Sequence, residues 1–138
     1  MVLAFHLKEL NGIIEWWKKL DLQQSCQPLI KCIERWDISA IDQFSEYTKL
    51  VYQALLNIYS DMEAEVAKEG RSYAMDYAKE LTKQTIKAHF HEAKWHQEGY
   101  VPPMEEYRQV AFISTGYAML ITSSFVGMGK VATKKAFD

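Results

Sequence analysis

The sequence predicts an all-α protein. Apolar residues recur at spacings of three and four over most of the 138 residues, which is typical of amphipathic helices, and strand-like alternation is nearly absent. Glycine and proline separate these periodic segments, where they end helices or open turns. Hydrophobic residues make up 49% of the chain, which is enough for a packed core. We therefore expect residues 1–138 to form one domain, or part of one, of antiparallel long helices joined by short loops.

Two helices are expected in the first quarter of the chain. Residues 4–20 carry an apolar stripe with helical spacing, formed by Phe5, Leu7, Leu10, Ile13, Ile14, Trp17 and Leu20. A polar stretch then leads to Pro28. Because proline is tolerated in the first turn of a helix, we expect a second helix to begin there and to end near Asp37.

Two long helices are expected in the middle of the chain. Ser39 and Ser45 are candidate N-caps, because a serine hydroxyl can accept a hydrogen bond from a free N–H at a helix start. The second of them precedes an apolar stripe over residues 46–68. A further helix is expected over residues 72–98, and Gly99 supplies its C-terminal stop.

The last expected helix covers residues 104–126, after the rigid connector Val101-Pro102-Pro103. It contains Gly116 and is apolar nearly all the way round, so it needs neighbours on every side. Thr133 resembles the N-cap of another helix that the chain does not complete. These two features lead us to expect a truncated bundle with an unfinished apolar surface, which would favour self-association.

Composition argues against several classes of protein. The formal net charge is -2 and no basic surface is evident, so a nucleic-acid partner is not expected. No apolar run is expected to reach the roughly 18 residues that span a bilayer, and the N-terminus does not resemble a secretory signal. Two cysteines, Cys26 and Cys32, suggest a reducing compartment. The expected location is therefore cytoplasmic.

Histidines do not predict a zinc site. His91 and His96 are five positions apart, which turns their imidazoles about 140° away from each other on a helix. His89 and His96 share a face but lie two turns apart, too far to hold one ion without other ligands. The two cysteines also lack a second pair at zinc spacing. We interpret the histidines as polar or half-buried helical residues.

An acidic stripe is the other metal candidate. Asp61, Glu65 and Glu69 lie at spacings of four, and such carboxylates could hold magnesium together with a diphosphate. Lys68 and Arg71 lie close by, however, and this mixture is typical of a solvated helix face. Asp61 and Glu65 therefore remain weak candidates for metal ligands.

Several segments resemble plant class I terpene synthases, and the likeness is greatest to the sesquiterpene-forming branch. From Ile33 to Asp138 the likeness is continuous, and a short separate block precedes it. The segments that carry it are residues 15–21 (EWWKKLD), 33–37 (IERWD), 92–107 (EAKWHQEGYVPPMEEY), 114–117 (STGY) and 122–129 (TSSFVGMG). The resemblance implies a terpenoid synthase helical bundle and a magnesium-dependent reaction on a prenyl diphosphate such as farnesyl diphosphate.

The departures from that family matter for function. In the family, a long stretch carrying the DDxxD motif separates the two tryptophan-containing segments, whereas Trp17 and Trp36 are only 19 positions apart and no Asp-Asp pair occurs. The resemblance thus implies an internal deletion between Gln24 and Pro28. The second metal motif would lie beyond Asp138. In the family, these two motifs hold three magnesium ions that trigger diphosphate departure, so we expect no tight magnesium binding here.

The resemblance also implies where a pocket wall would lie. A helix break around Ser114, Thr115 and Gly116 is the family position at which backbone carbonyls point at a carbocation, and Tyr117 would add an aromatic face. Glycine suits such a break because it tolerates the bend. The alternative for Gly116 is close packing against a neighbouring helix.

Three functional hypotheses follow. The leading one is a terpene synthase-like fragment that does not cyclise farnesyl diphosphate alone. The second is a helical binding or assembly module that pairs with its own copy or with a full-length synthase. The third is a minimal enzyme that uses Asp61 and Glu65 as substitute metal ligands.

Overall fold

A computed structural model describes residues 22–39 and 41–138, and side chains from Pro28 onward. The helix predicted over residues 4–20 lies outside the described residues. Within them the structure is helical and contains no strand, which confirms the all-α prediction. The α-helices are α2 (Leu22–Arg35), α3 (Glu46–Lys68), α4 (Tyr73–Glu98), α5 (Met104–Ser114) and α6 (Tyr117–Gly127). Three short 3-10 helices are η1 (Ile41–Gln43), η2 (Gly129–Val131) and η3 (Lys134–Ala136).

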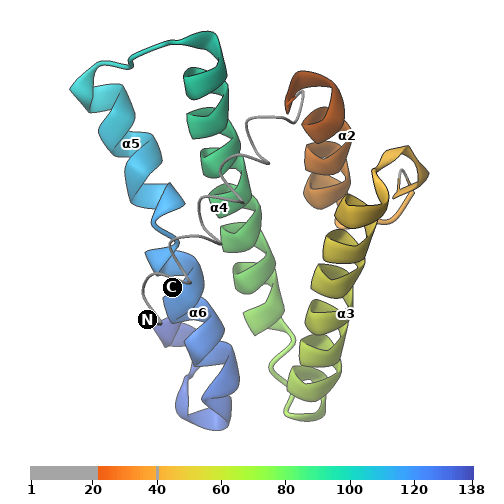
Figure 1. The fold of residues 1–138 in the computed structure, drawn as a ribbon. Helices are drawn as coiled ribbons and strands as arrows, with labels where there is room; N and C mark the ends of the chain where they lie inside the picture. Colours follow the sequence, from red (N-terminus) through yellow and green to blue (C-terminus); the bar gives the residue numbers. More distant parts are fainter. Residues whose placement is uncertain (1–21, 40) are drawn as a thin grey trace, which may run out of the picture.

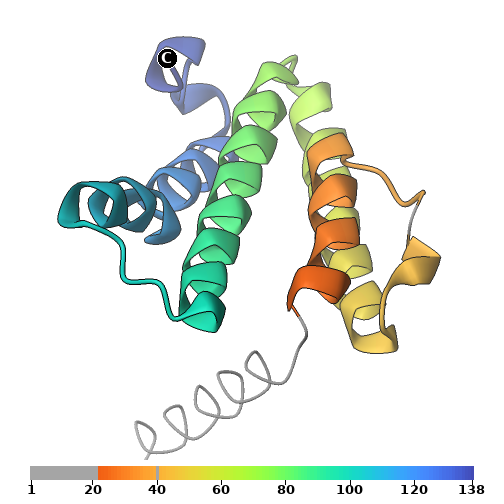
Figure 2. The same ribbon diagram turned by 90° about the horizontal axis from the view of Figure 1, so that it is seen from above.

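Helix α4 lies in the middle of this arrangement and contacts α2, α3, α5 and α6. Figure 1 shows α3 and α4 as an antiparallel hairpin, with α5 and α6 following one another along the other side of α4. Seen from above in Figure 2, α2 and α3 lie on one side of α4, and α5 and α6 on the other. The predicted antiparallel helices with short loops are thus present.

The two long helices have the boundaries that their caps predict. Ser45 Oγ accepts a hydrogen bond from the Thr48 backbone N–H at 3.4 Å, at the start of α3. At the end of α4, Gly99 adopts a left-handed φ of 63°, and the Tyr100 N–H donates to the Trp95 carbonyl at 2.9 Å. This is a Schellman-type end, which favours glycine because a Cβ is strained at positive φ.

Helix α2 differs from the prediction at its start. It begins at Leu22, so Pro28 lies inside the helix and not in its first turn. Proline lacks the N–H that would bond four residues back, but the residues on either side of it keep the helical conformation. Ser39 is not a helix cap either, because its N–H and hydroxyl both donate to Asp37 Oδ1, at 3.1 Å and 2.7 Å.

The predicted continuous helix over residues 104–126 is two helices. Gly116 has a φ of 70°, and the helical conformation stops at Thr115 and resumes at Tyr117. The stretch Met104–Gly127 nevertheless has a mean hydropathy of 1.5 over a window of membrane-spanning length, of which 17% is buried. The expectation that no apolar run reaches this length was therefore wrong. Length and composition alone are weak grounds for a membrane span.

Two clusters of buried side chains form the core of the described residues. One joins α3, α4 and α6 through Tyr59, Val66, Ala74, Met75, Ala78 and Val126. The other joins α2, the segment before α3 and α3 through Cys32, Ile33, Phe44 and Tyr52. Helix α5 contributes no buried residue to either. The core therefore lies mainly between α3 and the first turns of α4. Helix α5 packs against α4 outside this core.

Candidate functional site

The break between α5 and α6 is the candidate site that the sequence predicts. The Gly116 N–H donates to the Ile113 carbonyl at 3.0 Å, and the Gly116 carbonyl accepts from the Leu120 N–H at 2.9 Å. Between them, the carbonyl oxygens of Ser114 and Thr115 accept no hydrogen bond from the described part of the chain. A carbonyl without a donor keeps its partial negative charge available, so the break presents two electronegative groups.

Glycine is required at this break by backbone conformation, not by space. A Cβ built on Gly116 would lie 3.7 Å from Met119 Cε and 3.9 Å from Thr85 Cγ2, which are ordinary van der Waals distances. The φ of 70° is the feature that an L-residue other than glycine rarely adopts. Of the two readings for Gly116, the geometry thus favours the bend over close helix packing.

The hydroxyl groups at the break are already engaged. Ser114 Oγ donates to Glu92 Oε1 on α4 at 2.6 Å, and Glu92 Oε2 lies 3.6 Å from His89 Nδ1. Thr115 Oγ1 donates to the Phe112 carbonyl at 2.8 Å. These contacts fix the end of α5 against α4. They leave the two backbone carbonyls, and not the hydroxyls, as the groups at the break without a hydrogen bond from the described residues.

Tyr117 is the fourth predicted pocket residue, and it lies largely exposed. Its side chain is 71% exposed, beside the exposed Leu120 and Ile121 on the same helix. This surface is mostly apolar, and the Tyr117 hydroxyl is the polar group that these three side chains contribute to it. It can therefore cover an apolar ligand, but nothing in the described residues encloses it.

The weak metal candidates lie elsewhere. Helix α3 turns Tyr52, Tyr59 and Val66 toward the core, and Asp61 is two positions after Tyr59, about 200° round the helix. Asp61 is accordingly exposed on the outer surface. Because α4 separates α3 from α5 and α6 in Figure 2, the structure does not bring Asp61 near the break.

The carboxylates present do not fit a magnesium–diphosphate centre. Glu65 Oε2 pairs with Lys68 Nζ at 2.8 Å, and Glu69 Oε2 pairs with Arg71 Nη1 at 3.1 Å. Among the described residues, no group of three or more His, Cys, Asp or Glu side chains could hold a metal ion. Hard cations need several oxygen ligands at once, and two exposed carboxylates do not supply them.

The other candidate ligands also remain separate. His91 lies against Trp95, with ring centroids 6.5 Å apart, and His89 faces Glu92. Cys32 is a buried free thiol, and the side chain of Cys26 lies outside the described residues.

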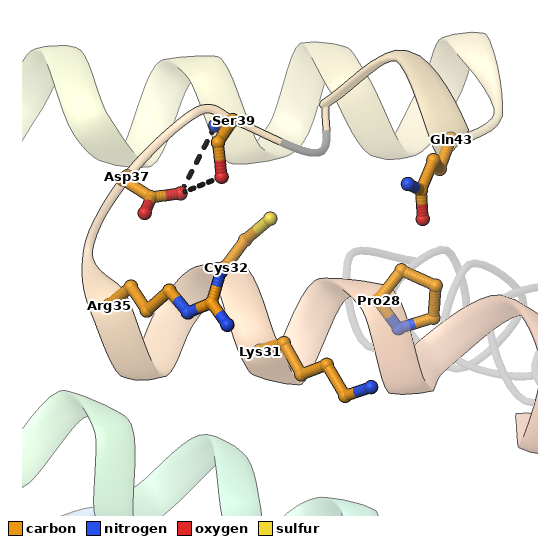
Figure 3. Close-up of a pocket in the computed structure, with 7 residues that line it drawn as sticks. All are labelled: Pro28, Lys31, Cys32, Arg35, Asp37, Ser39 and Gln43. Atoms are coloured by element: carbon orange, nitrogen blue, oxygen red, sulfur yellow. Dashed lines mark hydrogen bonds between the residues drawn. The ribbon is translucent and has the colours of Figure 1, made fainter.

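A hollow of about 260 Å³ lies on the opposite side of α4 from the break, between α2 and the segment before α3. Figure 3 shows its lining: Pro28, Lys31, Cys32, Arg35, Asp37, Ser39 and Gln43. The hydrogen bonds from Ser39 hold the pKa of the Asp37 carboxyl below its usual range. The hollow is lined by this carboxylate and by the exposed Lys31 and Arg35, so it carries mixed charge.

Sequence reasoning missed one buried residue that shapes the end of α6. Arg71 is 5% exposed, and its guanidinium donates to the carbonyls of Phe125, Val126 and Ala132 at 3.0 to 3.3 Å. Phe125 and Val126 lie in the last turn of α6, where carbonyls have no helical donor, so Arg71, in the turn between α3 and α4, caps this helix and also binds the end of η2. The position of Arg71 directly after Gly70 gave no signal of this contact.

Comparison with known proteins adds a family to this geometry. A family model described as terpene synthase family, metal binding domain matches residues 22–138. The chain is similar to (-)-germacrene D synthase of Vitis vinifera, with 56% identity over 108 residues that cover 78% of this chain and 19% of that protein. Valencene synthase of the same plant is 55% identical over 109 residues, covering 79% and 20%.

A third relative aligns with the whole chain. Sesquiterpene synthase 2 of Toona sinensis is 35% identical over 191 residues, which cover 100% of this chain and 34% of that protein. The chain thus spans about a fifth to a third of the length of the curated relatives it matches.

Proposed function

Because the chain belongs to the terpene synthase family, whose metal binding domain uses divalent metal and a prenyl diphosphate, we propose that it supplies one wall of a terpene synthase pocket and does not ionise a prenyl diphosphate alone. The observation that carries this proposal is spatial. The break at Ser114–Gly116 and the candidate carboxylates of α3, Asp61 and Glu65, lie on opposite sides of α4. This separation supports a pocket wall that has no metal centre of its own beside it.

Chemistry explains why that separation matters. A prenyl diphosphate ionises when the negative charge developing on the leaving group is neutralised, and bound metal ions supply most of that stabilisation. The break offers carbonyl oxygens, which are electronegative and would stabilise a cation but repel a diphosphate. This chain's residues therefore suit the hydrocarbon end of the substrate, with farnesyl diphosphate as the proposed substrate class of the family branch.

Alignment lengths support an internal deletion as the reason. The alignment with the Toona protein runs over 191 residues although this chain has 138, so at least 53 positions lie opposite no residue here. The alignments with the two Vitis proteins cover only 108 and 109 residues. We place the missing segment between Gln24 and Pro28, where the resemblance puts the aspartate-rich motif.

A cytoplasmic location completes the proposal. It is supported by the buried free thiol of Cys32, which is typical of a reducing compartment.

Product analysis tests the proposal. The purified chain is incubated with farnesyl diphosphate, with and without magnesium, and extracts are analysed by gas chromatography–mass spectrometry. We expect no hydrocarbon above the no-protein control, while the Vitis (-)-germacrene D synthase, assayed in parallel, gives product. Circular dichroism must show that the chain is helical in the assay. A magnesium-dependent product that disappears in Asp61→Ala or Glu65→Ala would overturn the proposal in favour of the minimal enzyme.

The second candidate function is an assembly module. It is favoured by the apolar side chains that α5 and α6 expose, among them Phe112 at 72% and Tyr117 at 71%. Apolar surface of this extent is unusual on a monomer and marks an interface. A module of this kind would pair with its own copy or with a full-length synthase.

A further inference from the structure

We propose that two copies of this chain pair through the outer surface of α5 and α6, antiparallel to each other about a two-fold axis near Tyr117. We call this surface the α5–α6 face. Its exposed apolar residues are Met104, Tyr107, Phe112, Ile113, Tyr117, Leu120, Ile121 and Met128. The inference deepens the assembly function proposed above, and it does not depend on whether the chain is catalytic.

The α5–α6 face is long and carries large apolar side chains. Residues 104–127 extend over about 36 Å of helix at 1.5 Å per residue. Phe112 and Tyr117 expose 72% and 71% of their side chains, and an aromatic side chain can bury roughly 150–250 Å². Leu120 and Ile121, which are also exposed on α6, add to this area, and a standard interface buries roughly 800 Å² per partner.

Charged residues lie only at the two ends of the α5–α6 face. No charged residue occurs between Arg108 and Lys130. The end near the start of α5 is acidic, with Glu98, Glu105 and Glu106, and the end after α6 is basic, with Lys130, Lys134 and Lys135. An apolar centre with opposite charges at its two ends is complementary to its own copy only when the copy runs the other way.

Some of these charges are free to form ion pairs with a second copy. Glu105 is held by Arg108 at 2.7 Å, and Lys134 is held by Asp138 at 3.0 Å. Glu106 accepts only the neutral hydroxyl of Tyr100, at 2.9 Å. Lys130 and Lys135 have no ion pair within the described part of the chain. A two-fold axis near Tyr117 sets the acidic end, and Glu106 in particular, against the basic end of the second copy at Lys130.

A comparison with α3 shows why this face and not another is the interface. Helix α3 also exposes apolar residues, including Leu50 at 71% and Ile58 at 56%. The acids at its two ends are paired within the helix, however, Glu46 with Lys49 at the start and Glu65 with Lys68 near the end. Helix α3 therefore lacks the acidic and basic ends that make the α5–α6 face complementary to an antiparallel copy.

The same charges argue against a lipid surface as the occupant. Segments that lie on membranes carry lysine and arginine along their polar edge, because the lipid headgroups are anionic. The α5–α6 face instead has a carboxylate cluster at one end, and its helix is broken at Gly116. A second copy satisfies both ends, whereas a membrane satisfies one.

Sedimentation velocity over a concentration series tests the pairing, with two variants of matched exposure. Leu120 is 59% exposed on the α5–α6 face, and Ile58 is 56% exposed on α3. We expect the unmodified chain and Ile58→Glu to be dimers at tens of micromolar. Leu120→Glu places a charge in each half of the interface, and we expect its dimer Kd to rise by more than about tenfold. Circular dichroism confirms that each variant is helical.

Charge reversal tests the antiparallel orientation. Glu106→Lys and Lys130→Glu should each weaken the dimer, and the double variant should restore it because the two charges exchange places. The pairing is overturned if the unmodified chain stays monomeric, or if Ile58→Glu dissociates the dimer and Leu120→Glu does not. It is also overturned if the double variant dimerises no more tightly than either single variant. If the chain stays monomeric and binds lipid vesicles, and Leu120→Glu abolishes that binding, the face would be assigned to lipid instead. Product analysis is a separate readout, so a monomer without product overturns the pairing alone.

Discussion

Ser114 Oγ donates a 2.6 Å hydrogen bond to Glu92 Oε1, and this contact joins the last residue of α5 to the side of α4. The two residues are 22 positions apart in the sequence. The bond is partly buried, and its acceptor is a carboxylate that also faces His89. It therefore holds the helix break in place from one side, while the positive φ of Gly116 sets the turn itself.

Removing the Ser114 hydroxyl should destabilise the protein. We expect Ser114→Ala to lower the free energy of unfolding by about 1–2 kcal/mol, because a hydrogen bond to a charged group is lost. Chemical denaturation followed by circular dichroism measures this. Ser124→Ala is the control, since Ser124 Oγ bonds only the Leu120 carbonyl of its own helix and alanine favours helix. A smaller loss in Ser114→Ala than in Ser124→Ala would contradict the role of the bond.

Gly116 should tolerate asparagine better than alanine. Gly116→Ala forces a Cβ into the left-handed region, and we expect a cost of about 1–2 kcal/mol in the free energy of unfolding. Asparagine enters that region more readily, so Gly116→Asn should cost less. Thermal or chemical unfolding compares the two. Gly127→Ala, at a helical position with nothing within 4 Å of its Cβ, should be neutral or stabilising; equal losses at both glycines would refute the conformational argument.

Arg71 should be among the least replaceable polar residues in the described chain. Arg71→Met removes the donors to three carbonyls and leaves Glu69 unpaired, and we expect a loss of about 3 kcal/mol. Arg71→Lys keeps the charge but not the fork of donors, so it should fall between. Arg108→Met, at an exposed ion pair, should cost less than about 1 kcal/mol. Similar losses at Arg71 and Arg108 would show that the buried contacts contribute little.

Tyr52 should make the protein sensitive to alkaline pH. Its hydroxyl donates to the Asp37 carbonyl at 2.6 Å, and burial raises its pKa to about 12 from an ordinary value of 10.0. Because the folded state holds this proton more tightly than the unfolded state, stability is retained below pH 10 and falls as the pH rises toward 12. Tyr52→Phe should cost about 1 kcal/mol at pH 7. It should also flatten the decline above pH 10 in a pH series of urea denaturations, and an unchanged slope would contradict this.

Sequence reasoning predicted the long helices well because their ends are marked by local chemistry. Ser45 and Gly99 act through hydrogen bonds to residues three to five positions away, which a sequence pattern can express. Pro28 was misleading because proline only disfavours a helix interior. The split of residues 104–126 also escaped periodicity, since both halves are apolar and one glycine in a helix is usually tolerated.

The candidate site was predictable only in part. The break at Ser114–Gly116 was expected from the family resemblance, not from the spacing of apolar residues. The partners that support it were not predicted, because the contacts Ser114–Glu92 and Arg71–Phe125 join residues 22 and 54 positions apart. Trp36 shows the same limit: its φ of 57° is unusual for a bulky residue, and its ring packs against Tyr59, 23 positions away, with centroids 4.8 Å apart.

The interruption at Thr115 and Gly116 also allows α5 and α6 to unfold independently of each other. A continuous helix frays from its end, and each opened turn weakens the next. Here the hydrogen-bond ladder stops at the break, and α5 has no buried residue, whereas α6 is anchored by Thr122 and Val126. Helix α5 can therefore open as a unit between Pro103 and Gly116 while α6 stays docked, so its amides should exchange with solvent well before those of α4. Gly116 thus separates a helix that opens readily from one that stays packed on the core.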